Sequence, residues 1–207
     1  TMPDRPTAVL SGPNFAIEIA KGLPAAATLA STDLTLAKHL TSILNSSSFR
    51  LYASDDIAGV QLAGAAKNVV AIGAGIVIGA GLGENGRAAL ITRAVAEIAR
   101  LAEALGGRAA TLAGLSGVGD LILTCTGRGS RNYSLGIELG EGRPLSAILA
   151  SRTTVAEGVL TAPALVALAH KMGVHVPILE TITHLLSEKL TLEEARTLLL
   201  DRPPTLE

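Results

Sequence analysis

Gly64-Ala-Ala-Lys67-Asn68-Val-Val-Ala-Ile-Gly73 is the stretch of sequence that most constrains the fold, because it places a single cation in a run of small and aliphatic residues. Lys67 is the only charged residue between Asp56 and Glu84. The run without any charge, residues 69–83, is shorter than the roughly 20 residues that a membrane-spanning helix needs. The sequence therefore predicts a buried core helix and no membrane span.

Lys67 is also the leading candidate for a catalytic acid or base. On a helix, its neighbours on the preceding and following turns are Ala63, Gly64, Ala71 and Ala74, whose small side chains leave room for a ligand. Partial removal from water lowers the pKa of an ammonium from about 10.4 toward the range in which a lysine gives and takes protons. A second interpretation is structural: a lysine that extends to solvent or pairs with a core carboxylate.

The composition favours closely packed helices and small partners. Apolar residues make up 48% of the 207 residues, yet the chain has no Trp, two Tyr and two Phe, so aliphatic side chains must build the core. The formal net charge of −1 argues against a nucleic-acid-binding surface or a polybasic membrane patch. We therefore expect a small molecule or a second copy of the chain as partner.

Cysteine and histidine residues indicate neither a disulfide nor a metal site. Cys125 is the only cysteine, which excludes an intrachain disulfide and is typical of a reducing, cytoplasmic compartment. We expect its side chain to be buried. The four histidines, at positions 39, 170, 175 and 184, lack a metal-ligand spacing, so we expect no bound metal.

The first part of the chain alternates strand-like and helix-like segments. In the order β-α-β-α-β, these segments are 8–11, 14–21, 25–31, 34–45 and 49–53. Asp33 is positioned to cap the second helix. Such alternation is typical of a sheet with helices on its faces, but three strands make a poor domain alone. We therefore expect residues 1–53 to be the C-terminal part of an α/β domain whose earlier part is missing.

The remainder of the chain, residues 54–207, predicts an all-helical domain. Asp55 and Asp56 precede the long apolar helix and fit as cap and dipole partners better than as paired catalytic acids. Further helical patterns occur at 87–105, 134–140, 145–151, 161–172, 178–188 and 192–200. The predicted fold class is mainly α, a multi-helix domain preceded by a short β-α-β-α-β remnant.

Residues 127–133, with the sequence Gly-Arg-Gly-Ser-Arg-Asn-Tyr, form the second informative segment. Its two glycines allow the backbone to approach a ligand, and Ser130 can cap the helix expected after it. The free amides of that helix, with Arg131 and Asn132 in its first turn, suit a phosphate group. A solvated basic loop is the alternative interpretation.

One further carboxylate, Asp120, follows the glycine-rich segment 114–119, which we expect to be flexible. Three roles stay open for Asp120: a contact to a substrate hydroxyl, a partner for Lys67, or a helix cap. Gly73-Ala-Gly75 superficially matches a dinucleotide-binding fingerprint, but no strand leads into it. We assign these glycines to the core helix.

Six segments, taken in order, resemble one known family. They are 10–13 (Leu-Ser-Gly-Pro), 66–75 (Ala-Lys-Asn-Val-Val-Ala-Ile-Gly-Ala-Gly), 87–93 (Arg-Ala-Ala-Leu-Ile-Thr-Arg), 115–121 (Leu-Ser-Gly-Val-Gly-Asp-Leu), 124–132 (Thr-Cys-Thr-Gly-Arg-Gly-Ser-Arg-Asn) and 155–158 (Val-Ala-Glu-Gly). Over essentially the whole chain they resemble the bacterial NAD(P)-dependent glycerol-3-phosphate dehydrogenases.

The resemblance implies reversible hydride transfer between NAD(P)H and dihydroxyacetone phosphate, a phosphorylated three-carbon substrate. The product, sn-glycerol 3-phosphate, would serve phospholipid synthesis. The resemblance also implies a Rossmann-type domain before Thr1, of which residues 1–53 are the end. Residues 54–207 would then be the substrate-binding and catalytic domain.

The resemblance also assigns site residues. Lys67 matches the family's proton donor and acceptor at the carbonyl or alcohol oxygen, in agreement with the argument from its surroundings. The implied substrate contacts are Gly12, Asn14, Lys67, Asp120, Ser130, Arg131 and Asn132. The implied cofactor contacts are Ala16, Arg131, Val155 and Glu157.

The chain departs from the family pattern in three places. Asn14 stands where Ser or Thr is expected, and Glu84 replaces Asp. The glycine-rich phosphate loop is absent, so the main NAD(P)H-binding domain is missing and we expect no turnover by this chain alone. Two alternatives stay open: another lysine-dependent hydroxyacid or phosphosugar dehydrogenase, and a non-catalytic phosphate-binding or dimerisation module. The apolar helical surface is consistent with a homodimer.

Overall fold

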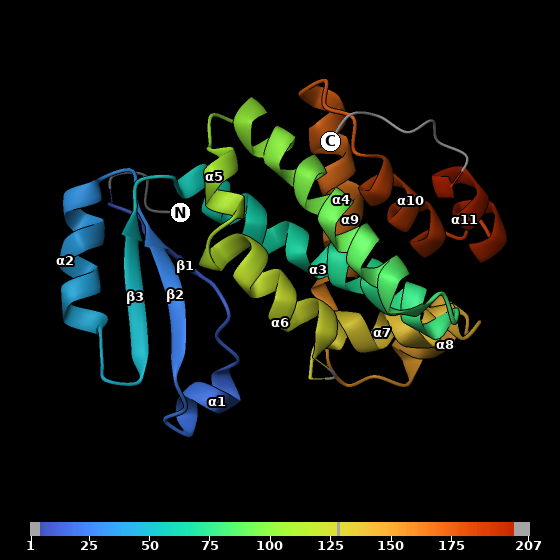
Figure 1. Ribbon diagram of the computed structural model, residues 1–207, viewed down its shortest axis with the longest axis horizontal. Coiled ribbons are helices and arrows are strands. Elements are labelled where there is room, and N and C mark those ends of the chain that lie inside the picture. The colour runs from blue at the N-terminus through green and yellow to red at the C-terminus, as the bar shows by residue number, and fades with distance from the viewer. Residues whose placement is uncertain (1–4, 128, 201–207) are drawn as a thin grey trace.

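The computed structural model describes residues 5–127 and 129–200, and shows a small sheet part followed by a larger helical part (Figure 1). The sheet part contains β1 (Val9–Ser11), α1 (Ala16–Ala20), β2 (Ala25–Ala30), α2 (Leu34–Leu44) and β3 (Phe49–Ser54). The helical part contains α3 (Ile57–Gly79), α4 (Gly83–Ala104), α5 (Ala109–Leu112), the π-helical turn η1 (Leu115–Gly119), α6 (Asp120–Thr126), α7 (Arg131–Gly140), α8 (Leu145–Ala150), α9 (Glu157–Lys171), α10 (Pro177–Leu186) and α11 (Leu192–Leu200). The predicted fold class is confirmed, while the division into two domains stays a prediction.

The sheet has the strand order β1-β2-β3, and α2 packs on one of its faces (Figure 1). β2 and β3 are parallel, with Ala27 opposite Leu51, whereas β1 is antiparallel to β2. Leu29 and Ala37 join these two residues in a small core between the sheet and α2. Asp33 caps α2 as predicted, because its carboxylate accepts two backbone amides at 2.8 and 3.2 Å.

The helix α1 differs from its prediction. It has five residues, none of them buried, and it lies beyond the N-terminal end of β2 without covering a face of the sheet (Figure 1). A helix that connects two parallel strands packs across the sheet, but the antiparallel pair β1 and β2 needs no such crossover. The residues before α1, among them Phe15, instead line a cleft next to the helical part.

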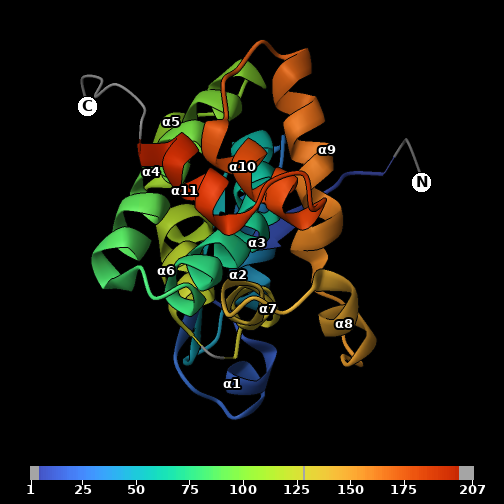
Figure 2. The same cartoon turned by 90° about the vertical axis from the view of Figure 1, so that its right-hand side faces the viewer.

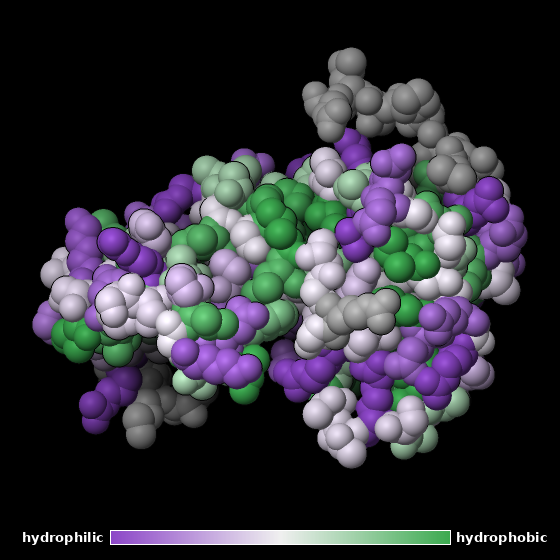
Figure 3. Space-filling view, turned by 60° about the horizontal axis from the view of Figure 1, so that its bottom comes forward, coloured by the Kyte–Doolittle hydropathy of each residue, from purple (hydrophilic) through white to green (hydrophobic). Residues whose placement is uncertain are grey.

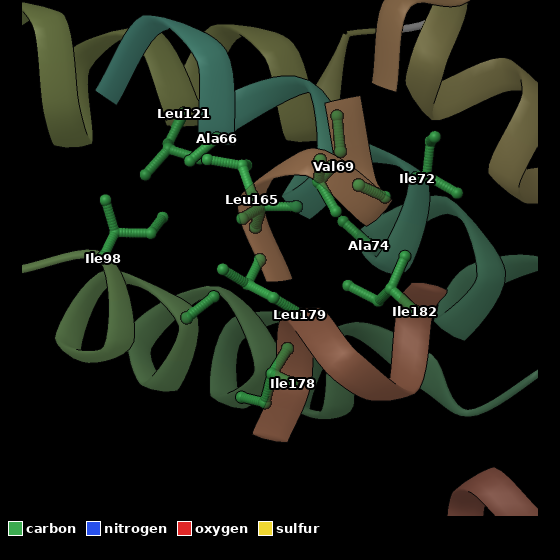
Figure 4. Packing of buried hydrophobic residues seen from close by; sticks show 14 of the residues in the cluster. Ala66, Val69, Ile72, Ala74, Ile98, Leu121, Leu165, Ile178, Leu179 and Ile182 are labelled. Carbon is green, nitrogen blue, oxygen red and sulfur yellow. The ribbon is translucent and has the colours of Figure 1, made fainter. Parts of the chain in front are cut away.

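The long helix α3 is the centre of the helical part. Fourteen of its 23 residues are buried, and α4, α6, α7, α9 and α10 pack around it (Figures 1 and 2). In Figure 4, Val69 and Ile72 of α3 lie among Leu165, Leu179 and Ile182 of neighbouring helices. Removal of these aliphatic side chains from water supplies the driving force for the packing.

Burial, and not length, distinguishes α3 from a membrane span. The helix is longer than the uncharged run at 69–83, because it begins at Ile57. Asp56 caps this start by accepting the Gly59 amide at 2.8 Å. By length and composition alone, α3 and residues 109–126 would each suffice to cross a membrane. However, 67% of the apolar window of α3 is buried by other elements, and Gly117 interrupts the helical path in residues 109–126. Neither segment is a clear membrane span.

Several helices begin earlier than their sequence patterns indicated. α4 begins at residue 83 instead of 87, and α9 at 157 instead of 161, whereas α7 begins at 131, before its apolar pattern at 134–140 but directly after the predicted cap Ser130. No helix was predicted over residues 109–126, where the structure has α5, η1 and α6. The approach to Asp120 is also not the flexible segment that we expected, because Ser116 and Gly117 are buried.

Glycines bring α3 and α7 into close contact. A Cβ atom at Gly75 would lie 2.8 Å from the Ile137 nitrogen, and one at Gly136 would overlap the carbonyl oxygen of Ile72. Two helix backbones approach this closely only where no Cβ atoms separate them. The crossing places the first turn of α7 beside the middle of α3, where Lys67 lies.

Candidate functional site

A cleft of about 480 Å³ lies where the sheet part meets the helical part. Its walls come from β1 and the residues after it, the middle of α3, and the start of α7. Figure 3 shows this side of the molecule, with a hollow between the sheet part at left and the helical part at right. The predicted site residues that line the cleft are Asn14, Lys67, Ser130, Arg131, Asn132 and Glu157.

Lys67 of α3 forms an ion pair with Asp120, the first residue of α6. The Lys67 Nζ and Asp120 Oδ2 atoms are 2.5 Å apart, and the two side chains are 21% and 2% exposed. Thr124 donates a second hydrogen bond to the Asp120 carboxylate at 3.2 Å. The structural interpretation of Lys67 as a partner of a core carboxylate is therefore correct. The same contact holds the ammonium at the wall of the cleft, where an acid or base could act.

Opposing effects act on the pKa of Asp120. Burial raises this pKa, while the Lys67 ammonium and hydrogen bonds from Thr124 and the Gly12 backbone lower it in part. Removal of Lys67 would therefore raise the pKa of Asp120 further. Gly12 contributes only its backbone to the hydrogen bond with Asp120. A side chain does not fit at this position, since a Cβ atom would lie 2.8 Å from Ala27 Cα. Asp120 does not cap α6, since Gly119 holds the cap position.

The start of α7 brings positive charge to the cleft. Ser130 caps the helix as predicted, and its buried hydroxyl accepts the Tyr133 amide at 3.2 Å. Arg131 follows it, exposed and on the cleft wall. The amides at a helix N-terminus carry partial positive charge. A guanidinium, an ammonium and a helix N-terminus therefore face one cleft, which is suited to bind an anion such as a phosphate.

Asn132 connects three helices at the edge of the cleft. Its side-chain nitrogen donates to Asn68 of α3 at 2.9 Å, and its side-chain oxygen accepts the Gly158 amide of α9 at 3.0 Å. Asn68 in turn donates to Glu157 at 3.4 Å. Both ends of the Asn132 amide are thus bonded within the protein, and its contact to a substrate stays a prediction.

Other residues depart from the predicted set. Ala16 and Val155 are exposed and do not line the cleft. Asn68 and Thr124 do line it, although neither was predicted as a site residue. The available signals were that Asn68 follows Lys67 directly and that Thr124 lies one helical turn after an acidic residue.

Cys125 is fully buried in α6, as predicted, and burial raises its pKa to about 12. Such a thiol stays protonated at neutral pH and is a poor nucleophile. Within residues 5–127 and 129–200, no group of three or more His, Cys, Asp or Glu side chains is placed to hold a metal ion.

Comparison with known families gives the same result for both parts of the chain. The model of the family described as NAD-dependent glycerol-3-phosphate dehydrogenase C-terminus matches residues 56–197. The model of the family described as NAD-dependent glycerol-3-phosphate dehydrogenase N-terminus matches residues 1–37.

Individual relatives carry the same name. The NAD(P)+ glycerol-3-phosphate dehydrogenases of Gluconobacter oxydans and Rhodospirillum rubrum are 80% and 52% identical to the chain over its whole length. The chain spans 64% and 59% of the length of these relatives. Among solved structures, the glycerol-3-phosphate dehydrogenase of Coxiella burnetii is 42% identical, with a TM-score of 0.90 over 95% of this chain and 61% of that one. The match over residues 56–197 and the agreement of the folds show that the chain belongs to the NAD-dependent glycerol-3-phosphate dehydrogenase family.

Proposed function

We propose that the complete protein containing this chain is an NAD(P)-dependent glycerol-3-phosphate dehydrogenase that interconverts dihydroxyacetone phosphate and sn-glycerol 3-phosphate. The observation that carries the proposal is the Lys67–Asp120 ion pair on the wall of a cleft that also receives Arg131 and the start of α7. The relatives of this name, which match the whole chain, support it.

Lys67 is the proposed proton donor to the substrate. Reduction adds a hydride to C2 and a proton to the oxygen that C2 carries. The cofactor, when bound, supplies the hydride from C4 of its nicotinamide ring. The Lys67 ammonium gives its proton to the oxygen as negative charge develops there, and takes a proton back in the reverse direction. Asp120 keeps the ammonium in place, so that little reorganisation is needed during the reaction.

Arg131 is the proposed anchor for the substrate phosphate. A guanidinium can bind a phosphate through two hydrogen bonds, and the amides of the first turn of α7 add further donors. Ser130 and Asn132 shape this end of the cleft. Asn14 also lines the cleft, where its amide would take the place of the hydroxyl usual in the family.

The cofactor is proposed to contact only the rim of this chain. Arg131 is exposed beside the cleft and can attract a dinucleotide phosphate, whereas the Glu157 carboxylate can accept hydrogen bonds from hydroxyl or amide groups. Ala16 and Val155, at the surface, would be peripheral contacts. These groups fit one side of a dinucleotide. We therefore propose that a Rossmann-type region elsewhere in the complete protein supplies most of the NAD(P)H site, and that this chain alone has no turnover.

The oxidation of NAD(P)H driven by dihydroxyacetone phosphate tests the proposal. The assay compares this chain, the complete product of its reading frame, and the Lys67→Ala variant of that product. Lys38→Ala, at an exposed position on α2, is the matched control. We expect activity in the complete product and in the control, and a loss of kcat of at least about 100-fold in Lys67→Ala, because a positioned general acid contributes that much.

The same assay separates two roles and two substrate classes. Arg131→Ala should mainly raise the KM for dihydroxyacetone phosphate, because it removes a binding group and leaves the proton donor. Equal losses of both kinetic parameters in both variants would contradict this division. Dihydroxyacetone without its phosphate should be a poor substrate. Equal turnover of the two compounds would move the function to another class of dehydrogenase.

We further propose a role in supplying glycerol 3-phosphate for phospholipid synthesis, a cytoplasmic location and a homodimer. The buried, protonated Cys125 is consistent with a reducing compartment. Exposed apolar side chains on the helical part, such as Leu160 (74% exposed), are consistent with a second copy. Sedimentation of the complete protein over a range of concentrations would test the dimer.

A further inference from the structure

Arg152 lies on the connection between α8 and α9 and is a largely buried cation outside the cleft wall. Its side chain is 15% exposed, and its Nε atom is buried without a hydrogen-bond partner in the described part of the chain. Burial of a guanidinium costs free energy unless other contacts compensate it. The contacts of its two terminal nitrogens must therefore explain its position.

Both terminal nitrogens of Arg152 bind to α7. Nη1 donates to the carbonyl oxygen of Arg131 at 2.9 Å and to the hydroxyl of Ser134 at 3.2 Å, while Nη2 pairs with the Glu138 carboxylate. Residues 131, 134 and 138 form one stripe along the helix. Arg152 thus holds the first turn of α7, where the substrate phosphate is proposed to bind.

The segment that carries Arg152 leads directly to the proposed cofactor contacts. Val155 and Glu157 follow Arg152 by three and five residues. On another face of α7, the side chain of Asn132 accepts the backbone amide of Gly158. The first turn of α7 is therefore bonded both to the α8–α9 connection, through Arg152, and to the start of α9, through Gly158.

We propose that Arg152 is a positioning residue that couples substrate binding to cofactor binding, an inference that rests on the proposed function. A phosphate bound by Arg131 favours one position of the first turn of α7. Because Arg152 bonds this turn to the α8–α9 connection, the same position is favoured for the segment with Val155 and Glu157. The second ligand then finds its contacts already in place, so that each ligand strengthens the binding of the other. Arg152 itself touches neither ligand.

The experiment compares Arg152→Ala with Arg143→Ala in the complete product of the reading frame. Arg143 is a matched control, because it pairs with the same Glu138 carboxylate from the opposite end of α7 and has no described hydrogen bond to Arg131. The readout is the dissociation constant of NADPH with and without saturating glycerol 3-phosphate, a pair of ligands that cannot react together. The ratio of the two constants is the coupling factor.

We expect a coupling factor of about 5 or more in the parent protein, a value near one in Arg152→Ala, and the parental value in Arg143→Ala. The KM values for NADPH and dihydroxyacetone phosphate should each rise about tenfold in Arg152→Ala, as expected for the loss of a charge-assisted hydrogen bond. Its kcat should stay within about twofold of the parent, because the contacts of Lys67 and Asp120 are untouched.

A residue with a merely structural role would lower the thermal unfolding midpoint and keep the parental coupling factor, a result that would overturn the proposal. A parent without coupling would overturn it too. Arg152→Lys serves if Arg152→Ala does not fold, because an ammonium keeps the charge but cannot bind Arg131 and Glu138 together as a planar fork does. Retained coupling in that variant would also refute the proposal. A parent without activity on dihydroxyacetone phosphate would instead refute the proposed function.

Discussion

The substitution Gly75→Ala tests how the crossing of two helices holds the cleft together. A Cβ atom at this position would overlap the carbonyl oxygen of Tyr133, and would lie 2.8 Å from the Ile137 nitrogen and 2.9 Å from Gly136 Cα, all three in the backbone of α7. Ordinary van der Waals contact begins at 3.4 Å, so relief of the overlap with the Tyr133 oxygen would require the two helices to move apart by about 1 Å. A helix backbone cannot turn aside as a flexible side chain can, and α7 must therefore shift relative to α3.

The size of the effect follows from two opposing contributions. Overpacking of a close interface destabilises by up to about 3 kcal/mol, whereas replacing a helical glycine by alanine stabilises by about 1 kcal/mol. The net loss of about 2 kcal/mol corresponds to a Tm lower by roughly 4–8 °C for 150–250 residues, and by somewhat less for the longer complete protein. Gly73→Ala, on the same helix, is the matched control. Its Cβ would lie 2.5 Å from Cδ1 of Ile182, the end of a flexible side chain, so its Tm should change little.

The assay combines thermal unfolding with activity of the complete protein. Gly75→Ala should lower Tm and also reduce kcat/KM by at least about tenfold, because Arg131 moves away from Lys67 and a displacement of about 1 Å can cost 100-fold in rate. Gly73→Ala should keep both properties. Equal Tm values for the two variants would refute the packing argument. A lower Tm with unchanged activity would refute the link between the helix crossing and the cleft.

Three further predictions concern buried acidic and thiol groups. Burial raises the pKa of Asp56, but hydrogen bonds from the Thr111 side chain and two backbone amides bring it below 3.8 on balance. The stabilisation by the Asp56 carboxylate is therefore fully present above the pKa of the unfolded state and is lost as the pH falls through the lower pKa of the folded state. Asp56→Asn should thus flatten the fall of Tm below about pH 4. An unchanged profile of Tm against pH would contradict this. Glu97 accepts hydrogen bonds from two backbone amides of α10 at 2.8 and 3.2 Å. Glu97→Ala should therefore destabilise the folded protein by about 1.5–3 kcal/mol, as measured by thermal unfolding. The control Glu103→Ala, at an exposed position of the same helix, should have a smaller effect. Cys125, with its pKa raised to about 12, should resist alkylation at about pH 8 until the protein is denatured, as mass spectrometry would detect; rapid alkylation of the folded protein would contradict its burial.

Local features of the fold could be predicted from the sequence, whereas features that depend on distant partners could not. The caps at Asp33, Asp56 and Ser130 were predicted, because a cap involves a side chain and amides two or three residues away. The start of α9 was not. The Gly158 amide in its first turn is bonded to Asn132, a residue 26 positions earlier in the chain, and no local pattern records such a partner.

The same distinction between local and distant features applies to the residues of the cleft. Lys67 could be recognised because a single cation in an apolar run is visible in the sequence, but its partner Asp120 lies 53 residues away and three roles stayed open for it. Asn68 and Arg152 have ordinary sequence surroundings. Asn68 gains its role only because close glycine contacts place α7 against α3, and Arg152 gains its role only because α9 begins beside the first turn of α7. The width of the helix crossing at Gly75 thus decides whether the hydrogen bonds around the cleft form, so a substitution there should disturb the site without removing any residue that lines it.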